Sequence, residues 1–263
     1  MKLKNKTIVI TRQPEQARTL TQLIEKEGGK AVLFPTIATV AADENIAGQE
    51  RVIARLEQFD WLIFTSENAV KFFLKRLQDG AIQLPAIKIA AVGSRTAETL
   101  EKEGIPIHLI PDDFSAKGLI DAFTTSELRG TKILIPSSNL AREELQTGLK
   151  LHGAQVETVI FYKTVPNPNF DHKAFRSLLL NKQIDVITFF SPSAFNFLVE
   201  ILCLEGLNLL QTSETRLAAI GQTTARAINM QGLKVHIIPK ISTSKGMVEA
   251  IINYYEGKED ERK

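Results

Sequence analysis

The sequence contains an internal duplication, and this feature restricts the possible folds more than any other. Residues 89–111 read IAAVGSRTAETLEKEGIPIHLIP, and residues 217–239 read LAAIGQTTARAINMQGLKVHIIP. The glycines that follow the first apolar run are Gly93 and Gly221, and 221 minus 93 gives an offset of 128. Each copy has an apolar run, a turn, an amphipathic segment that ends at glycine, and a second apolar run. This pattern predicts strand, loop, helix and strand in both copies.

Other segments repeat at nearly the same offset, and together they cover most of the chain. The matched pairs are TIVITR (7–12) with KILIPSS (132–138), DWLIFTSENAVKFF (60–73) with DVITFFSPSAFNFL (185–198), and FSAKGLIDAF (114–123) with STSKGMVEAI (242–251). Each half then has about five strands that alternate with helices. We therefore predict two doubly wound parallel sheets of the flavodoxin-like α/β class.

Two segments interrupt this pattern at equivalent places, and they predict the domain boundaries. FPTIATV (34–40) and YKTVPNPNF (162–170) each contain proline and extended residues after the second strand of a half. If the chain crosses from one lobe to the other at both places, residues 1–37 and 167–263 form one discontinuous domain. Residues 41–164 then form the second domain, and we expect the ligand cleft between the two.

The charges and the motifs exclude several classes of protein. Lys and Arg number 32 and Asp and Glu number 30, so no overall charge attracts nucleic acid or a membrane surface. The single cysteine, Cys203, excludes an internal disulfide, and no histidines have the spacing of metal ligands. Neither an export signal nor an apolar stretch of about 18 residues is recognised. We expect a soluble cytoplasmic protein that binds neither nucleic acid nor membrane.

The turns after the predicted strands are the candidate binding sites. In doubly wound sheets, ligands bind beyond the carboxyl ends of the strands, and the N-terminus of a helix offers unpaired backbone N–H groups to anions. An alternative is that the serines and threonines only cap helices. The candidate donors are Thr65, Ser66, Gly93, Ser94, Thr96, Ser138, Ser191, Ser193, Gly221, Gln222, Thr223 and Thr224.

The ordered motifs resemble the uroporphyrinogen-III synthase family over essentially the whole chain. They are ITR, FTSENAV, AAVGSRTAETL, LAREEL, VIFYKTV, FFSPSAF and AAIGQTTARAI. The resemblance implies two flavodoxin-like domains joined by a two-stranded β connector. It also implies a lyase of haem biosynthesis that cyclises hydroxymethylbilane to uroporphyrinogen III, with loss of water and inversion of ring D. Such an enzyme uses no metal or organic cofactor, and we expect a monomer that contacts the preceding pathway enzyme at most transiently.

The resemblance also assigns roles to individual residues. Tyr162, in FYKTV, matches the family's tyrosine, whose hydroxyl could either hydrogen-bond to the departing hydroxyl of the bilane or protonate it. The alternative is a strand tyrosine with a buried ring and an exposed hydroxyl. Arg12 and Arg216 are candidates for binding substrate carboxylates, or are solvated surface residues. Many members carry an arginine where this chain has Ser137 and Ser138, and Arg142, on a predicted helix over 139–153, is placed too far along to replace it.

Two other functions remain open at this stage. A two-lobed protein that closes on a small polyanion without chemistry would have the same architecture. Such receptors are usually exported, and the start of this sequence does not resemble a signal. A regulatory member of the family would be expected to carry an appended DNA-binding domain.

Overall fold

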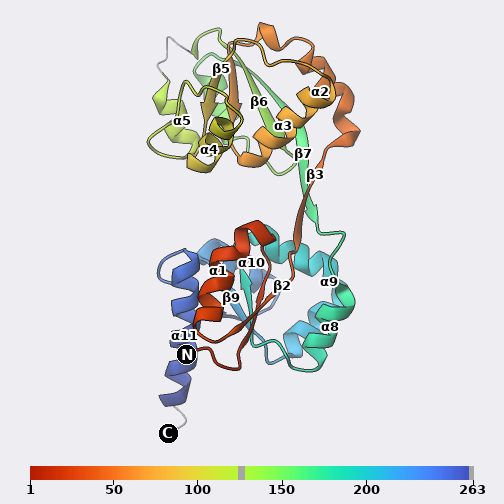
Figure 1. Ribbon diagram of the computed structural model, residues 1–263, viewed down its shortest axis with the longest axis vertical. Coiled ribbons are helices and arrows are strands. Elements are labelled where there is room, and N and C mark those ends of the chain that lie inside the picture. Colours follow the sequence, from red (N-terminus) through yellow and green to blue (C-terminus); the bar gives the residue numbers. More distant parts are fainter. Residues whose placement is uncertain (124–127, 261–263) are drawn as a thin grey trace. The chain divides into compact units, whose positions relative to one another are not determined.

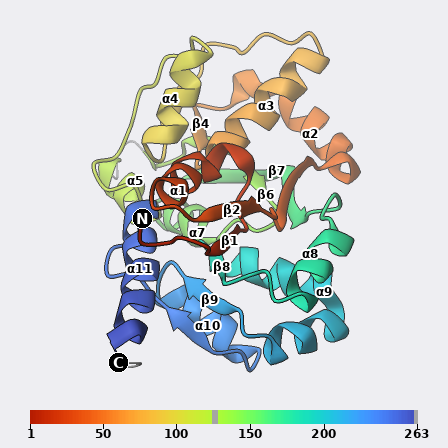
Figure 2. The same ribbon diagram turned by 60° about the horizontal axis from the view of Figure 1, so that its bottom comes forward.

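The computed structural model describes residues 1–123 and 128–260, which form two mostly parallel, five-stranded sheets covered by helices (Figures 1 and 2). The chain divides into two compact units. Unit 1 contains Met1–Ala38 and Val165–Lys263, and unit 2 contains Thr39–Thr164. The predicted α/β class with two doubly wound sheets is confirmed.

In unit 1 the strands lie side by side in the order β10-β9-β8-β1-β2. When the five strands are numbered along the chain and read from the β2 edge, this is the order 2-1-3-4-5 of flavodoxin-like sheets. Helices α8, α9 and α10 pack on one face of the sheet, and α1 and α11 pack on the other. The elements are β1 (Thr7–Ile10), α1 (Pro14–Lys26), β2 (Lys30–Leu33), α8 (His172–Leu180), β8 (Val186–Phe189), α9 (Pro192–Thr212), β9 (Arg216–Ala219), α10 (Gln222–Met230), β10 (Val235–Ile237) and α11 (Ser244–Asp260).

Unit 2 has the strand order β3-β7-β6-β4-β5. Side chains alternate across the sheet, so that Leu62 and Phe64 face a core with α2, α3 and α4, whereas Ile63 faces a core with α5 and α7. The elements are β3 (Ile37–Ala41), the short 3-10 helix η1 (Asp43–Asn45), α2 (Ile46–Ile53), η2 (Leu56–Gln58), β4 (Trp61–Phe64), α3 (Glu67–Asp79), β5 (Lys88–Ala91), α4 (Ser94–Lys102), α5 (Ala116–Ala122), β6 (Lys132–Ser138), α7 (Glu144–Leu151) and β7 (Gln155–Pro166).

The sequence repeat and the compact units do not coincide. The first βαβ segment of each half joins the later strands of the other half, so that β1 pairs with β8 and β6 pairs with β4. Both pairs are parallel and adjacent, with Ile8 opposite Val186 and Trp61 opposite Ile133. Each sheet therefore contains strands from both copies of the duplication.

The strand predicted over 105–111 forms only an isolated bridge between Ala90 and Leu109. Beside this bridge, the side chain of a histidine takes the place of a backbone acceptor: the N–H of Ile89 donates to Nδ1 of His108 at 3.1 Å. The equivalent bond occurs in the other copy, where the N–H of Leu217 donates to Nδ1 of His236. The register of β10 against β9 shifts between Val235 and Ile237, on either side of this histidine. These two histidines thus hold the backbone in both copies.

Among the described residues, α9 is the one helix with the length and composition of a membrane span, although Glu200 and Glu205 interrupt its apolar residues. It spans 21 residues with a mean hydropathy of 1.5, and by length and composition alone it could cross a membrane. The same pattern is found in helices that cover the core of soluble proteins. Ala194, Phe195 and Leu198 of α9 belong to a core of unit 1, and at Cys203 the backbone leaves helical geometry, with φ 54°.

Candidate functional site

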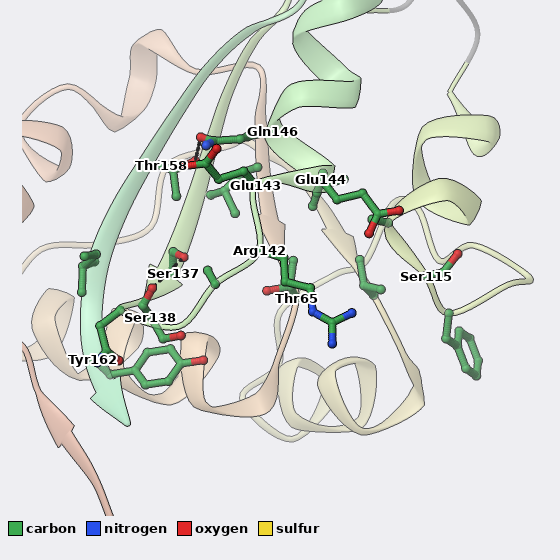
Figure 3. Close-up of a pocket in the computed structure, with 18 residues that line it drawn as sticks. Thr65, Ser115, Ser137, Ser138, Arg142, Glu143, Glu144, Gln146, Thr158 and Tyr162 are labelled. Atoms are coloured by element: carbon green, nitrogen blue, oxygen red, sulfur yellow. Dashed lines mark hydrogen bonds between the residues drawn. The ribbon is translucent and has the colours of Figure 1, made fainter. Parts of the chain in front are cut away.

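A cavity of about 670 Å³ opens in unit 2 at the carboxyl ends of β4, β5 and β6 (Figure 3). This is the edge of the sheet where the ligand was predicted to bind. The lining contains both polar and apolar side chains. It consists of Thr65, Val92, Phe114, Ser115, Ala116, Ile135, Ser137, Ser138, Asn139, Ala141, Arg142, Glu143, Glu144, Leu145, Gln146, Thr158, Ile160 and Tyr162.

Tyr162 reaches this cavity because β7 contains an irregularity. Along β6 and β7, Ser137 pairs with Ile160 but Ser138 pairs with Tyr162, so Phe161 is an extra residue in β7. Bulges of this kind reorient the side chains that follow them. The extra residue leaves backbone carbonyls of β7 outside the ladder.

Side chains of η1 and α2, together with the backbone N–H of Ala42, bind those carbonyls. The amide of Gln49, which is buried, donates to the carbonyl of Ile160 at 3.0 Å, and the amide of Asn45 donates to the same oxygen at 3.1 Å. The N–H of Ala42 donates to the carbonyl of Phe161 at 3.1 Å. Because buried carbonyls need partners, these bonds stabilise the bulge that positions Tyr162.

The phenol itself is fixed by two contacts. Its ring stacks on Phe72, with centroids 5.5 Å apart and an interplanar angle of 15°, and its hydroxyl lies 2.9 Å from Oγ of Ser66. Ser66 also caps α3, because its Oγ accepts the N–H of Ala69 at 3.1 Å. When Ser66 donates its own hydrogen to Tyr162, the phenolic hydrogen is left for a ligand. Tyr162 is only 7% exposed, so its side chain is held within the fold and is not a mobile surface side chain.

The next residue of β7, Lys163, has a different partner. Its ammonium pairs with the carboxylate of Glu44 in η1, and this hydrogen bond holds the pKa of Glu44 below its usual value. Since Lys163 is already ion-paired and does not line the cavity, the positive charge of FYKTV is not presented to a ligand there.

The segment before α7 differs from its prediction as a helix over 139–153, because α7 begins only at Glu144. Asn139 holds the preceding loop against β7: its Oδ1 accepts the N–H of Thr164 at 2.8 Å, and its Nδ2 donates to the carbonyl of Thr164 at 3.3 Å. The N–H of Leu140 donates to Oγ of Ser138 at 3.2 Å. Arg142 therefore lies in a loop that lines the cavity, and its assignment to a helix was wrong.

Comparison with known proteins identifies the family. A model of the family described as uroporphyrinogen-III synthase HemD matches residues 18–249. The uroporphyrinogen-III synthase of Chlorobaculum parvum is 30% identical over 252 residues, which are 94% of this chain and 98% of that protein. The chain belongs to the uroporphyrinogen-III synthase family.

Two solved structures of uroporphyrinogen-III synthases share the fold. A mutant of the Thermus thermophilus enzyme has a TM-score of 0.62 at 20% identity, and the match covers 96% of this chain and 99% of the other. The Helicobacter pylori enzyme has a TM-score of 0.61 at 17% identity, with 94% and 99% covered. The resemblance drawn from the sequence motifs is confirmed at the level of family and fold.

The two glycine turns of this synthase-family chain lack side-chain caps. Helix α4 follows Gly93, which has φ 102°, and α10 follows Gly221. Ser94, Gln222 and Thr223 are exposed in the first turns. By contrast, Thr96 and Thr224 are buried, and the hydroxyl of Thr96 donates to the carbonyl of Val92. The exposed turn residues and the backbone amides, rather than these two threonine hydroxyls, are thus the accessible donors.

In unit 1, two predicted binding residues have structural contacts. Ser191 caps α9 by accepting the N–H of Ala194 at 3.1 Å, as Ser66 does for α3. The guanidinium of Arg12 lies over the ring of Phe190, 4.6 Å from its centroid. Ser193 is half-buried in the first turn of α9.

Arg216 does not lie at the edge of the sheet where the turns at Ser191 and Gly221 are found. It is the first residue of β9 and pairs with Val186 at the amino edge of the sheet, whereas Gly221 follows the carboxyl end of the same strand. Arg216 lines a separate cavity of about 320 Å³ with Lys4 and Tyr255. Arg216 precedes the apolar run that ends at Gly221, so the direction of the strand was the signal, missed at first, that places Arg216 at the opposite edge of the sheet.

Ser66→Ala is expected to reduce both stability and turnover. The loss of the cap should lower the free energy of unfolding by about 1 kcal/mol, and the loss of the bond to Tyr162 should lower kcat about threefold to tenfold. Denaturant unfolding and initial rates measure the two effects.

Asp171→Ala is the matched control for this change. Asp171 caps α8 in unit 1 by accepting the N–H of Ala174 at 2.9 Å, whereas Tyr162 belongs to unit 2. It should show a similar loss of stability with unchanged kcat. If both variants kept the wild-type rate, Ser66 would be only a helix cap.

Proposed function

We propose that this protein is a uroporphyrinogen-III synthase, a lyase that cyclises hydroxymethylbilane to uroporphyrinogen III with loss of water and inversion of ring D. Membership of the family over residues 18–249 carries this proposal. The placement of Tyr162, held by a bulge, a stacked ring and Ser66, supports it, since the family resemblance assigns the acid to this residue.

The reaction needs control of conformation more than strong chemical activation. A linear bilane cyclises without an enzyme, giving the isomer in which ring D is not inverted. The protein must therefore hold the chain so that the substituted carbon of the last ring meets the cation left by the departing hydroxyl. We infer that neutral hydroxyl and amide donors bind the substrate carboxylates, with Thr65, Ser66, Ser94 and Ser138 in unit 2. In unit 1, Ser191, Ser193, Gly221, Gln222 and Thr223 are the corresponding candidates.

Tyr162 would assist the first step of this reaction. Donation of the phenolic proton converts the departing hydroxyl to water and leaves an azafulvene cation on the terminal ring. The substituted carbon of ring D attacks this cation and forms a spiro intermediate. Its original bond to the preceding bridge carbon then breaks, and the formerly free α-carbon of ring D bonds to that bridge carbon and loses its proton, which restores the proton balance. The overall change is a loss of water without net oxidation, so no redox partner is consumed.

The proposed site of action is the cytoplasm. The single cysteine of the chain, Cys203, is exposed and free, which suits a reducing compartment. A fusion of the protein to a fluorescent reporter would test this location.

Isomer analysis tests the proposed activity. The purified protein is given freshly made hydroxymethylbilane, the products are oxidised, and the uroporphyrin isomers are separated by chromatography. We expect mostly isomer III with the protein and isomer I in the protein-free control. Isomer I alone, formed at the rate of the control, would refute the synthase proposal and favour a binding protein without chemistry.

A further inference from the structure

The cavity in unit 2 results from a departure from the repeat. At the offset of 125, Thr65 is equivalent to Phe190 (190 minus 65), and Ser137 is equivalent to Arg12 (137 minus 12). In unit 1 the large pair is in contact, with the guanidinium of Arg12 over the ring of Phe190. In unit 2 both positions carry small hydroxyl side chains, which line the cavity. The space that an arginine and a phenylalanine occupy in one unit is therefore open in the other.

The start of the helix enlarges this difference. In unit 1, α1 begins at Pro14, whereas α7 begins at Glu144, which is equivalent to Thr19 at the same offset (144 minus 125). The segment 139–143 is thus unwound relative to its repeat. The two hydrogen bonds between Asn139 and Thr164 hold it in this form, so the opening is a defined part of the fold.

Unwinding brings Arg142 to the cavity. It is the only lysine or arginine among the lining residues, and its side chain is exposed. Within residues 1–123 and 128–260, no hydrogen bond or ion pair to the Arg142 guanidinium is found. A planar guanidinium without a protein partner is well suited to bind a carboxylate through two parallel hydrogen bonds.

The neighbouring carboxylates give the cavity two different ends. In Figure 3 the guanidinium of Arg142 points downward, away from the carboxylates of Glu143 and Glu144 above it, and lies beside Thr65, whereas the phenol of Tyr162 lies farther away at the lower left. An anionic group entering the cavity would be repelled by the glutamates and attracted by Arg142. The expected position of a bound carboxylate is therefore at the guanidinium, on the side of Thr65 rather than that of the glutamates.

We propose that Arg142 binds one carboxylate side chain of the tetrapyrrole in this cavity and so positions the adjoining pyrrole ring beside Tyr162. This inference rests on the proposed function for the identity of the substrate. A cavity of about 670 Å³ accommodates a small organic ligand, which here corresponds to one pyrrole ring with its carboxylate arms. Hydroxyls of Thr65 and Ser138 supply neutral donors beside the charged one. Arg142 is thus a binding residue for the substrate rather than a proton donor.

Substitution of Arg142 separates binding from turnover. We expect Arg142→Gln to raise KM for hydroxymethylbilane by about 10- to 100-fold, because a charge-assisted pair is lost, while kcat changes less than threefold. The KM of Arg142→Lys should lie between those of wild type and Arg142→Gln, since an ammonium keeps the charge but cannot form the two parallel hydrogen bonds. The KM of wild type should also rise with ionic strength more steeply than that of Arg142→Gln.

Arg129→Gln is the matched control. Arg129 is an exposed arginine of unit 2 at the amino edge of the sheet, beside the bond from the N–H of Gly130 to the carbonyl of Gly153. It should keep the wild-type KM and kcat. Thermal unfolding of all three variants excludes a loss of folded protein as the cause.

A binding measurement distinguishes failure of this inference from failure of the proposed function. Uroporphyrinogen III, kept under nitrogen, is titrated into each protein in a calorimeter. A Kd raised at least tenfold by Arg142→Gln, and unchanged by Arg129→Gln, supports the role of Arg142 even if wild type makes no isomer III. Equal Kd and KM for wild type and Arg142→Gln would overturn it, even if wild type makes isomer III.

Discussion

Tyr162→Phe is expected to lower kcat by about 10- to 100-fold, which is at or below the lower end of the range for lost general acids. The effect is limited because hydroxymethylbilane also loses its hydroxyl without an enzyme. The ring of phenylalanine keeps the stack on Phe72, and only the bond to Ser66 is lost, so the free energy of unfolding should fall by about 1 kcal/mol or less. Initial rates at saturating substrate and denaturant unfolding measure the two quantities.

The matched control removes a hydroxyl from a tyrosine elsewhere. Tyr254 lies on α11 of unit 1, and Tyr254→Phe should leave kcat unchanged. The ratio of isomer III to isomer I gives a second readout, because a slower enzyme competes less well with spontaneous closure. Wild-type turnover in Tyr162→Phe would remove the phenol from the mechanism.

Gly246→Ala is expected to destabilise the protein by about 3 kcal/mol, as overpacking does in a close contact. Gly246 is buried in the first turn of α11, and a Cβ there would overlap the carbonyl oxygen of Ile241. The obstacle is backbone rather than a flexible side chain, so either the loop or the start of α11 must move. Thermal and denaturant unfolding measure the loss.

Gly257→Ala in the same helix is the control. A Cβ at Gly257 would meet nothing within 4 Å, and alanine favours helix by up to about 1 kcal/mol over glycine. It should leave stability equal or slightly higher. If Gly246→Ala behaved like Gly257→Ala, the tight approach at Ile241 would not restrict the residue.

The same contact explains why SAKG and TSKG repeat in the sequence. Gly118 in unit 2 meets the carbonyl oxygen of Asp113 as Gly246 meets that of Ile241. The lysines before them, Lys117 and Lys245, are exposed. The Lys-Gly dipeptide therefore repeats because the close turn requires glycine, and the lysine is not the reason.

Much of the fold was predictable because it depends on local periodicity and on repetition. The apolar runs that end at Gly93 and Gly221 are β5 and β9, and the two crossing segments mark where the chain passes between compact units, after Ala38 and before Val165. Strand ends of parallel sheets meet at one edge, so Thr65 and Ser138 could be placed in one site without a structure.

The details of the site depend on contacts between distant residues, and no local pattern encodes them. The segment 139–143 has a helical pattern, but the bonds from Asn139 to Thr164 keep it unwound and bring Arg142 to the cavity. The bulge that turns Tyr162 is stabilised by Gln49, 113 positions earlier (162 minus 49). The sequence signal for the loop over 139–143 was Asn139, directly after β6, because asparagine favours turns over helix interiors.

Unit 1 consists of two separate stretches of the chain, so it is completed late during synthesis on the ribosome. Unit 2 is one continuous stretch, Thr39–Thr164, and can fold as soon as it has emerged. Strand β1 must instead wait for β8, which begins 153 residues after β2 ends (186 minus 33). At about 5–20 residues per second this delay lasts roughly 8–30 s. During that time Ile8, Ile10 and Leu20 are without the strands that later bury them, and the nascent chain presents an apolar segment to chaperones.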